Sequence, residues 1–128
     1  PSGGQAAGWV SVRGTWYYLD PISGEMASGW TKVRDTWYYL GSSGAMRTGW
    51  MRDGSTWYYL ADSGAMATGW ARIGSSWYHF APSGAMSTGW VKDGGSWFYL
   101  SSSGAMVTGA RWIDGTRYVF DDEGRLQE

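Results

Sequence analysis

The apolar residues of this chain lie in short segments that are rich in β-forming side chains and are separated by Gly, Ser and Asp. No segment has the period of a helix. The pattern opens on a Gly-Trp pair, first at Gly8-Trp9, and a second aromatic block, Trp16-Tyr17-Tyr18-Leu19, begins seven residues after that tryptophan. Two β-forming segments joined by a turn predict a β-hairpin.

The hairpin pattern repeats every 20 residues, except that the first step is 21 because Asp20-Pro21-Ile22 carries one extra residue. A block such as Ser43-Gly44-Ala45-Met46 closes each repeat and is the expected connecting loop. Ser2-Gly3-Gly4-Gln5 lies where an earlier such block would lie, so residues 1–7 are expected to be the tail of a preceding repeat or a linker in a longer protein. The predicted repeats span residues 8–28, 29–48, 49–68, 69–88, 89–108 and 109–128.

The turn of each hairpin determines which side chains share a face. Asp114-Gly115 is typical of a two-residue turn in which both central residues have positive φ, and Arg13-Gly14 is the matching pair in the first repeat. Because strand side chains alternate, Trp9, Trp16 and Tyr18 then share one face, and aliphatic residues with the other tyrosine share the opposite face. A lone hairpin is marginal in water, so neighbouring hairpins must stack to supply a core. The sequence predicts an all-β solenoid of about six stacked hairpins.

Composition limits the function. The chain has 11 Trp, 9 Tyr and 21 Gly, but no Cys and no Asn. A net charge of −1 with scattered Lys and Arg provides no basic surface for nucleic acid or an anionic membrane, and no apolar run approaches the length of a membrane span. Without Cys there is neither a disulfide nor a thiolate metal site, and no cofactor is expected.

The Trp-Trp-Tyr face suggests a chemistry. Electron-rich ring faces attract cations, and quaternary ammonium groups are well suited to a box of aromatic rings because they have no N–H to donate. Methionine, soft and polarisable, is a suitable floor for their methyl groups.

At these residues the chain resembles the choline-binding repeats of cell-wall hydrolases and surface adhesins from Gram-positive bacteria and their phages. The matching pattern is Gly-Trp, then Trp-Tyr-Tyr-Leu, then Ser-Gly-Ala-Met, and it covers residues 8–126. The resemblance implies a left-handed β-solenoid with choline sites between successive hairpins. In that family two Trp come from one hairpin, and a Tyr and a Met come from the next.

The resemblance assigns residues to four sites and to one degenerate site. The four predicted sets are Trp9, Trp16, Tyr39 and Met46; Trp30, Trp37, Tyr59 and Met66; Trp50, Trp57, His79 and Met86; and Trp70, Trp77, Tyr99 and Met106. In the third set His79 stands where a Tyr is expected. At the fifth interface Trp90 and Trp97 remain but Val119 and Leu126 replace Tyr and Met, so that site is expected to be weak or absent.

The implied function is a non-catalytic module that binds choline or phosphocholine of wall teichoic and lipoteichoic acids, in a secreted, cell-wall-associated protein. The family also includes members that dimerise through their last hairpins, which leaves a homodimer open. An alternative is a glucan-binding module of an extracellular transferase or toxin, although sugar sites usually add Asn and Gln. Another is that the Trp residues are only core. An enzyme is disfavoured because the single His79 has no acid partner at a suggestive spacing.

Overall fold

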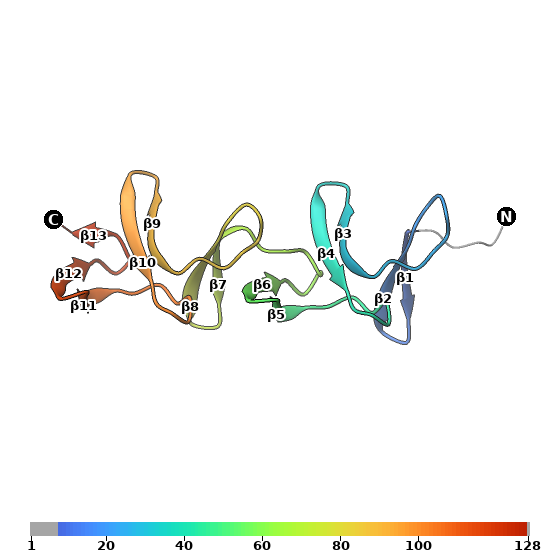
Figure 1. Ribbon diagram of the computed structural model, residues 1–128, viewed down its shortest axis with the longest axis horizontal. Coiled ribbons are helices and arrows are strands. Elements are labelled where there is room, and N and C mark those ends of the chain that lie inside the picture. The colour runs from blue at the N-terminus through green and yellow to red at the C-terminus, as the bar shows by residue number, and fades with distance from the viewer. Residues whose placement is uncertain (1–7, 128) are drawn as a thin grey trace. The chain divides into compact units, whose positions relative to one another are not determined.

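The computed structural model describes residues 8–127, so the predicted tail or linker at residues 1–7 lies outside the described residues. These residues form β-hairpins without a helix (Figure 1). None of them lies in a helix that is long and apolar enough to cross a membrane. The strands are β1 (Gly8–Val12), β2 (Thr15–Leu19), β3 (Gly29–Val33), β4 (Thr36–Leu40), β5 (Gly49–Asp53), β6 (Thr56–Leu60), β7 (Gly69–Ile73), β8 (Ser76–Phe80), β9 (Gly89–Asp93), β10 (Ser96–Leu100), β11 (Gly109–Ile113), β12 (Thr116–Phe120) and β13 (Leu126–Gln127).

The expected register is confirmed in every hairpin. In the first, Trp9 pairs with Tyr18 and Ser11 with Trp16, so Trp9, Trp16 and Tyr18 share a face. We call this face of each hairpin the tryptophan face, and the other the opposite face. In the second hairpin the opposite face carries Tyr38, which pairs with Thr31.

Three of the six hairpin turns, Arg13-Gly14, Gly94-Gly95 and Asp114-Gly115, have the predicted positive φ at both central residues, and in the other three only the first central residue has it. Asp114 and Gly115 have φ of 50° and 84°, both in the left-handed region. The two-residue turns of the other hairpins also begin with a positive φ, even where the residue is not glycine, as at Arg34 with φ of 59°. A side chain in this region is strained because Cβ crowds the carbonyl oxygen.

Replacing Arg34 with glycine should therefore stabilise the protein. Relief of the left-handed strain is worth about 1–2 kcal/mol, and the extra freedom of glycine in the unfolded chain offsets about 0.4–1 kcal/mol of it. We expect a net gain of about 0.5 kcal/mol in the free energy of unfolding, measured by urea denaturation. The control is Lys32→Gly in strand β3, which should destabilise by roughly 0.5–1 kcal/mol.

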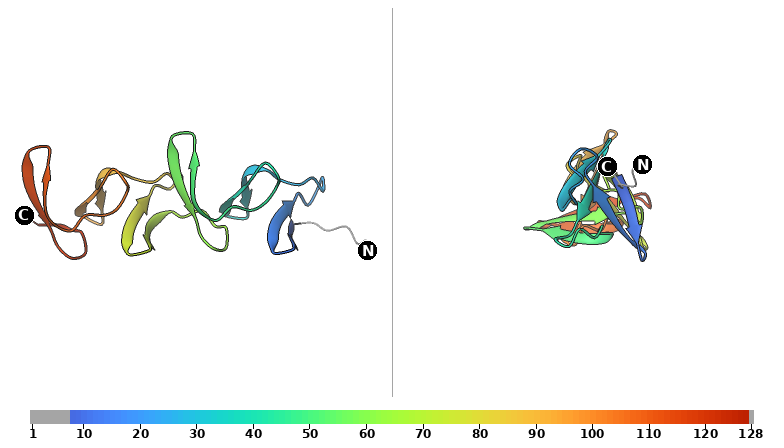
Figure 2. Two further views of the ribbon diagram at one scale, coloured as in Figure 1. Left: turned by 90° about the horizontal axis from the view of Figure 1, so that it is seen from below. Right: turned by 90° about the vertical axis from the view of Figure 1, so that its right-hand side faces the viewer.

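The chain divides into two compact units, Pro1–Ala67 with β1–β6 and Thr68–Glu128 with β7–β13. Within each unit the three hairpins project in different directions (Figures 1 and 2). The core lies at the base of the hairpins, where the second strand ends. In the first unit Leu40 and Leu60 are fully buried, and in the second unit Phe80 and Leu100 are fully buried.

The end of the second unit is closed by its own small core. Val107, Ile113 and Phe120 are buried together, with Leu126 of β13 packed against them. Strand β13 pairs with β12 through Phe120 and Leu126. Leu126, which stands where the other repeats have a methionine, therefore packs against the last hairpin.

The connecting loops join each hairpin to the one before it. In the second repeat Met46 bridges to Leu40 of its own hairpin, while its N–H donates to the Trp16 carbonyl of the preceding hairpin at 2.8 Å. Met66 donates likewise to the carbonyl of Trp37 at 2.9 Å. Met106 does the same with the carbonyl of Trp77 at 2.8 Å, so in both units this backbone hydrogen bond places a methionine beside the second tryptophan of the previous hairpin.

The loops also pack through a contact between methionine and glycine. A Cβ built on Gly64, where φ is +90°, would lie 2.4 Å from the Sδ atom of Met46, and one built on Gly44 would lie 2.4 Å from that of Met26. Only glycine lets the loop backbone approach the sulfur so closely. The glycine of the Ser-Gly-Ala-Met block is thus required by its backbone angle and by its neighbour.

The first loop accommodates its additional residue with a side-chain cap. The Asp20 carboxylate accepts hydrogen bonds from the N–H groups of Ser23, at 3.0 Å, and Ile22, at 2.8 Å. These backbone donors hold the pKa of Asp20 below its ordinary value. An aspartate that bonds to the backbone two and three residues on is a common turn device, so Asp20 is structural.

The predicted fold class is confirmed as all-β, with six hairpins at the 20-residue step within residues 8–127. The left-handed twist of the solenoid is implied by the resemblance and stays a prediction.

Candidate ligand-binding site

A pocket of about 390 Å³ lies between the first two hairpins. Trp9 and Trp16 of the first hairpin line it, together with Tyr38 and Met46 of the second repeat. The ring centroids of Trp9 and Tyr38 are 4.8 Å apart with an interplanar angle of 68°. We call these four residues the first cage. An edge-to-face pair of this kind leaves the remaining ring surface open to a ligand.

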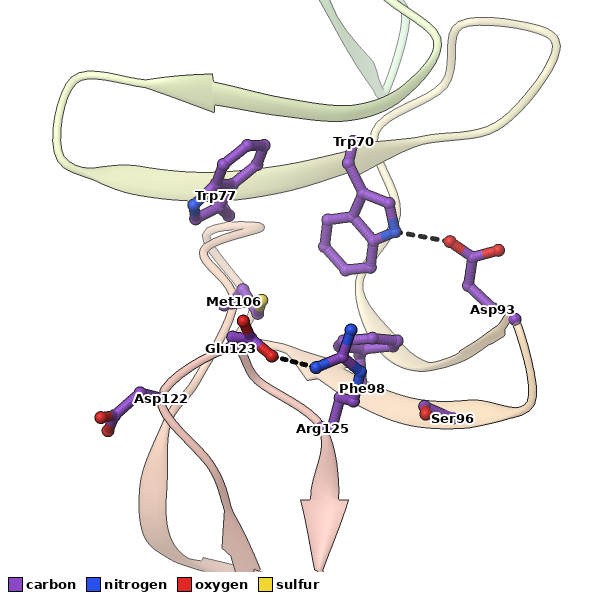
Figure 3. Close-up of a pocket in the computed structure, with 10 residues that line it drawn as sticks. Trp70, Trp77, Asp93, Ser96, Phe98, Met106, Asp122, Glu123 and Arg125 are labelled. Carbon is purple, nitrogen blue, oxygen red and sulfur yellow. Dashed lines mark hydrogen bonds and ion pairs between the residues drawn. The ribbon is translucent and has the colours of Figure 1, made fainter.

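A second pocket, of about 500 Å³, has the same construction in the second unit. Trp70 and Trp77 project from hairpin β7–β8 toward Phe98 and Met106 (Figure 3). Trp70 and Phe98 have their centroids 4.9 Å apart at 60°. These four residues are the fourth cage. A phenyl ring replaces the tyrosine of the first cage, so the phenol hydroxyl is absent from this pocket.

The same contacts recur around Trp30, in what we call the second cage: Trp30, Trp37, Tyr58 and Met66. The rings of Trp30 and Trp37 are 6.5 Å apart and nearly perpendicular, at 83°. Tyr58 of the next hairpin lies 4.8 Å from Trp30. The two indoles therefore form adjoining walls, and the tyrosine closes a third side.

The second tryptophan of each of the first five hairpins is exposed, from 38% for Trp37 to 44% for Trp16. A tryptophan that served only as core would be covered. Among residues 8–127 the largest fully buried side chains are Phe80, Leu40, Leu60 and Leu100. The tryptophan faces thus lie outside the core, as aromatic surfaces that remain accessible.

The structure places the second tyrosine of each pair differently from the sequence prediction. Tyr39 lies 5.2 Å from Trp30 of its own hairpin, at 74°, and Tyr38 is the residue that reaches Trp9. Residues at the positions equivalent to Tyr39 likewise pack on the tryptophan of their own hairpin: Tyr59 on Trp50, His79 on Trp70 and Tyr99 on Trp90. The structure thus brings together the predicted Trp, Trp and Met of the first and fourth sets, but with the neighbouring aromatic residue, Tyr38 or Phe98.

The physical reason is that a hairpin has two faces. Tyr39 shares the tryptophan face with Trp30 and Trp37, and that face lies toward the following hairpin, as the contact of Trp30 with Tyr58 shows. The second hairpin therefore offers the first cage only its opposite face. Tyr38 lies on that face because it is one residue away in a strand.

The third predicted set is divided between the two units. Trp50 and Trp57 belong to the first unit, with ring centroids 6.3 Å apart at 83°. His79 and Met86 belong to the second unit, where the Nδ1 atom of His79 lies 2.9 Å from the Ser87 hydroxyl. The grouping of these four residues stays a prediction from the sequence.

The fifth tryptophan pair keeps one contact of the other cages and adds another. Trp90 packs against Tyr118 at 5.0 Å, as Trp9 packs against Tyr38, and it also lies 5.8 Å from Phe120. The Lys92 ammonium lies 5.8 Å from the ring centroid of Trp97, so a cation of the protein itself is near this ring. The degenerate character of the fifth site stays a prediction from the sequence.

Sequence reasoning missed the carboxylates around the cages. Asp53 and Asp93 accept hydrogen bonds from the indole N–H groups of Trp30 and Trp70, at 3.0 and 2.7 Å. Their signal in the sequence is an aspartate just before the hairpin turn in the third and fifth repeats, where the other repeats have Val or Ile. In addition, Asp62 lines the pocket of the first cage and Asp122 lines the pocket of the fourth cage.

Arg125 and Glu123 also line the pocket of the fourth cage and form an ion pair with each other. Together with Asp93 and Asp122, they give its polar lining three acidic groups and one basic group. Such a rim favours a cation over an anion. Among the described residues, no group of three or more His, Cys, Asp or Glu side chains has an arrangement that would hold a metal ion.

Comparison with known families gives this geometry its context. The family profile of the choline-binding repeat matches residues 27–69 and 67–110, and a profile described as a cell wall binding repeat matches residues 7–26. This chain belongs to the choline-binding repeat family. No curated protein sequence matched the chain.

Solved structures similar to this choline-binding repeat chain come from Streptococcus pneumoniae and a phage. The structure of CbpJ from S. pneumoniae TIGR4 has a TM-score of 0.91 and 48% identity, with 95% of this chain and 42% of that chain covered. Choline-binding protein F, solved in the presence of a peptidoglycan analogue, has a TM-score of 0.90 and 46% identity over 95% and 41% of the two chains. The pneumococcal cell wall endolysin of phage Cp-1, complexed with choline, has a TM-score of 0.68 and 37% identity, with 96% of this chain and 37% of that chain covered. This chain therefore spans less than half the length of each of these relatives.

Proposed function

We propose that this choline-binding repeat chain is a non-catalytic module that holds its protein on the bacterial cell wall by binding choline groups in aromatic cages. The observation that carries the proposal is the cage itself: two adjoining tryptophans from one hairpin, an aromatic ring from the next, and a methionine. The second tryptophan of each cage is exposed, and carboxylates line the pockets of the first and fourth cages.

A trimethylammonium group fits this lining chemically. Its charge is spread over methyl groups that cannot donate a hydrogen bond, so ring faces and a thioether solvate it better than they solvate a primary ammonium. Each ring contact is worth about 0.5–2 kcal/mol. After the cost of association, one cage is expected to bind with about 4 kcal/mol, a dissociation constant near millimolar.

Weak individual sites suit a polymeric target. Teichoic and lipoteichoic acids that carry choline or phosphocholine present many copies of the ligand along one chain. Several cages on one module then raise the overall affinity through effective concentration. The proposed localisation is accordingly secreted and bound to the wall.

The proposed choline contacts follow the geometry of the cages. In the first cage they are Trp9, Trp16, Tyr38 and Met46, and the second and fourth cages contribute the corresponding residues. Any catalytic activity would belong to another part of the protein. The relatives support this division, since one of them is a multimodular cell wall endolysin complexed with choline.

The test is retention of the folded module on a tertiary-amine resin, elution with free choline, and a titration followed by tryptophan fluorescence. We expect elution and a fluorescence change at millimolar choline. The control ligand is dimethylbutanol, the neutral carbon isostere of choline, which has the same shape without the charge and should bind much more weakly. If the folded protein is neither retained nor responsive, choline binding is wrong and glucan polymers become the next ligands to test.

A further inference from the structure

Two of the cages have a tryptophan that is held by a carboxylate from the next hairpin. Asp53 Oδ2 accepts the indole N–H of Trp30 at 3.0 Å, and Asp93 Oδ2 accepts that of Trp70 at 2.7 Å (Figure 3). Both aspartates are the last residue of the first strand of their hairpin. A charge-assisted hydrogen bond of this length is among the stronger ones in proteins.

The equivalent position differs where the first cage is built. There the second hairpin has Val33, whose side chain has no acceptor for the indole N–H of Trp9. Val33 otherwise has the same setting as the two aspartates. It pairs with Thr36 across the turn, as Asp53 pairs with Thr56 and Asp93 with Ser96.

The hydrogen bond acts on the ring that the ligand would contact. It fixes the orientation of the indole before binding, so that less side-chain freedom is lost when a cation arrives. An N–H bonded to a carboxylate also pushes electron density into the ring, which strengthens attraction of a cation to its face. In the fourth cage Asp93 itself lines the pocket, so its charge adds to the attraction.

We propose that Asp53 and Asp93 are positioning residues that make the second and fourth cages bind choline more tightly than the first cage. This rests on the proposed choline binding. The cages of one module then fill in a defined order as choline rises, and the order is set by one residue before each hairpin turn.

The experiment follows the indole N–H resonances of the ¹⁵N-labelled chain during a choline titration, with each resonance assigned by a Trp→Phe substitution. Each resonance reports its own cage. We expect Trp30 and Trp70 to respond at about three- to tenfold lower choline than Trp9. Asp93→Val should raise the dissociation constant of the fourth cage by the same factor and shift the Trp70 N–H signal upfield, while the first cage is unchanged.

Two matched variants separate positioning from other roles. Asp93→Asn keeps an acceptor oxygen without the charge, so the dissociation constant of the fourth cage should fall between that of the parent and that of Asp93→Val. Val33→Asp places a carboxylate at the first cage and should tighten that cage by about three- to tenfold.

The outcomes are distinct. Unchanged affinities in Asp93→Val and Val33→Asp would overturn the proposal, as would an equal loss at every cage accompanied by a lower Tm, which would mean a purely structural bond. An Asn variant as weak as the Val variant would also overturn the positioning role. If no indole of the parent responds to choline, the proposed function itself fails, and the Trp70 shift in Asp93→Val still reports the hydrogen bond.

Discussion

Replacing Trp77 with alanine should raise the dissociation constant for choline at the fourth cage about tenfold or more while leaving the fold intact. Trp77 is 43% exposed and lies outside the buried core of its unit, so its removal leaves the core residues Phe80 and Leu100 covered. It is nevertheless one of the two tryptophan walls of the cage, and its loss removes a cation–π contact and the apolar cover of the methyl groups. Trp70 is a poorer choice, because it packs against both His79 and Phe98 at 4.9 Å and supports the hairpins.

The measurement is the choline dependence of the Trp70 indole resonance in the Trp77→Ala variant. The control is Trp112→Ala, because Trp112 is 73% exposed and lies opposite Arg117 rather than in a cage. That variant should bind like the parent. Unaltered binding at the fourth cage in Trp77→Ala, in a protein with the parent's circular dichroism, would show that the exposed tryptophan is no part of the site.

Replacing Gly64 with alanine should destabilise the first unit by about 3 kcal/mol and weaken the first cage. The added methyl carbon would lie 2.4 Å from the Sδ atom of Met46, and the residue would keep a φ of +90°. Overpacking costs about 1–3 kcal/mol and the backbone strain adds about 1–2 kcal/mol. Since Met46 is a wall of the first cage, displacing it also disturbs the pocket.

A matched control exists within the same repeat. Gly54 also has a positive φ, of +63°, but a Cβ built there meets nothing within 4 Å. Gly54→Ala should therefore show the backbone strain alone, about 1–2 kcal/mol, with the cage unchanged. The double variant Gly64→Ala, Met46→Ala should recover the part of the loss that comes from the clash. If Gly64→Ala and Gly54→Ala have the same free energy of unfolding, the contact between glycine and methionine has no energetic role.

The sequence was sufficient for the hairpins because their information is local. The spacing between Trp9 and Trp16, with two turn residues between the strands, determines the register, and the structure has that register. The 20-residue step then predicts stacking, since no single hairpin can cover its own opposite face. The all-β repeat class followed from these two observations.

Local information did not determine which tyrosine completes a cage. The face argument correctly placed Tyr39 with Trp30 and Trp37, but a side chain on the tryptophan face cannot also reach back to Trp9. Choosing between Tyr38 and Tyr39 requires the direction in which a hairpin stacks, and that depends on contacts between repeats. The backbone hydrogen bond from Met46 to Trp16 supplies that direction in the structure.

The carboxylates were beyond local reasoning for a related reason. Asp53 lies on the opposite face of its hairpin, so once the stacking direction is known it lies toward Trp30. Asp62 lines the first pocket although it follows the third hairpin, two repeats away from Trp9. A contact between a repeat and the next but one has no signature in the repeat consensus.

A cage in each unit draws its walls from two consecutive repeats, so it belongs to the junction between them. Gene segments that encode whole 20-residue repeats can then be duplicated, deleted or exchanged, and each new junction still joins a tryptophan face to an opposite face and a methionine loop. The length of such a module can change in evolution by one repeat at a time, and its valency for the ligand changes by one with it. Under the proposed role of Asp53 and Asp93, a change between aspartate and an aliphatic residue before the hairpin turn would be enough to alter the strength of one site.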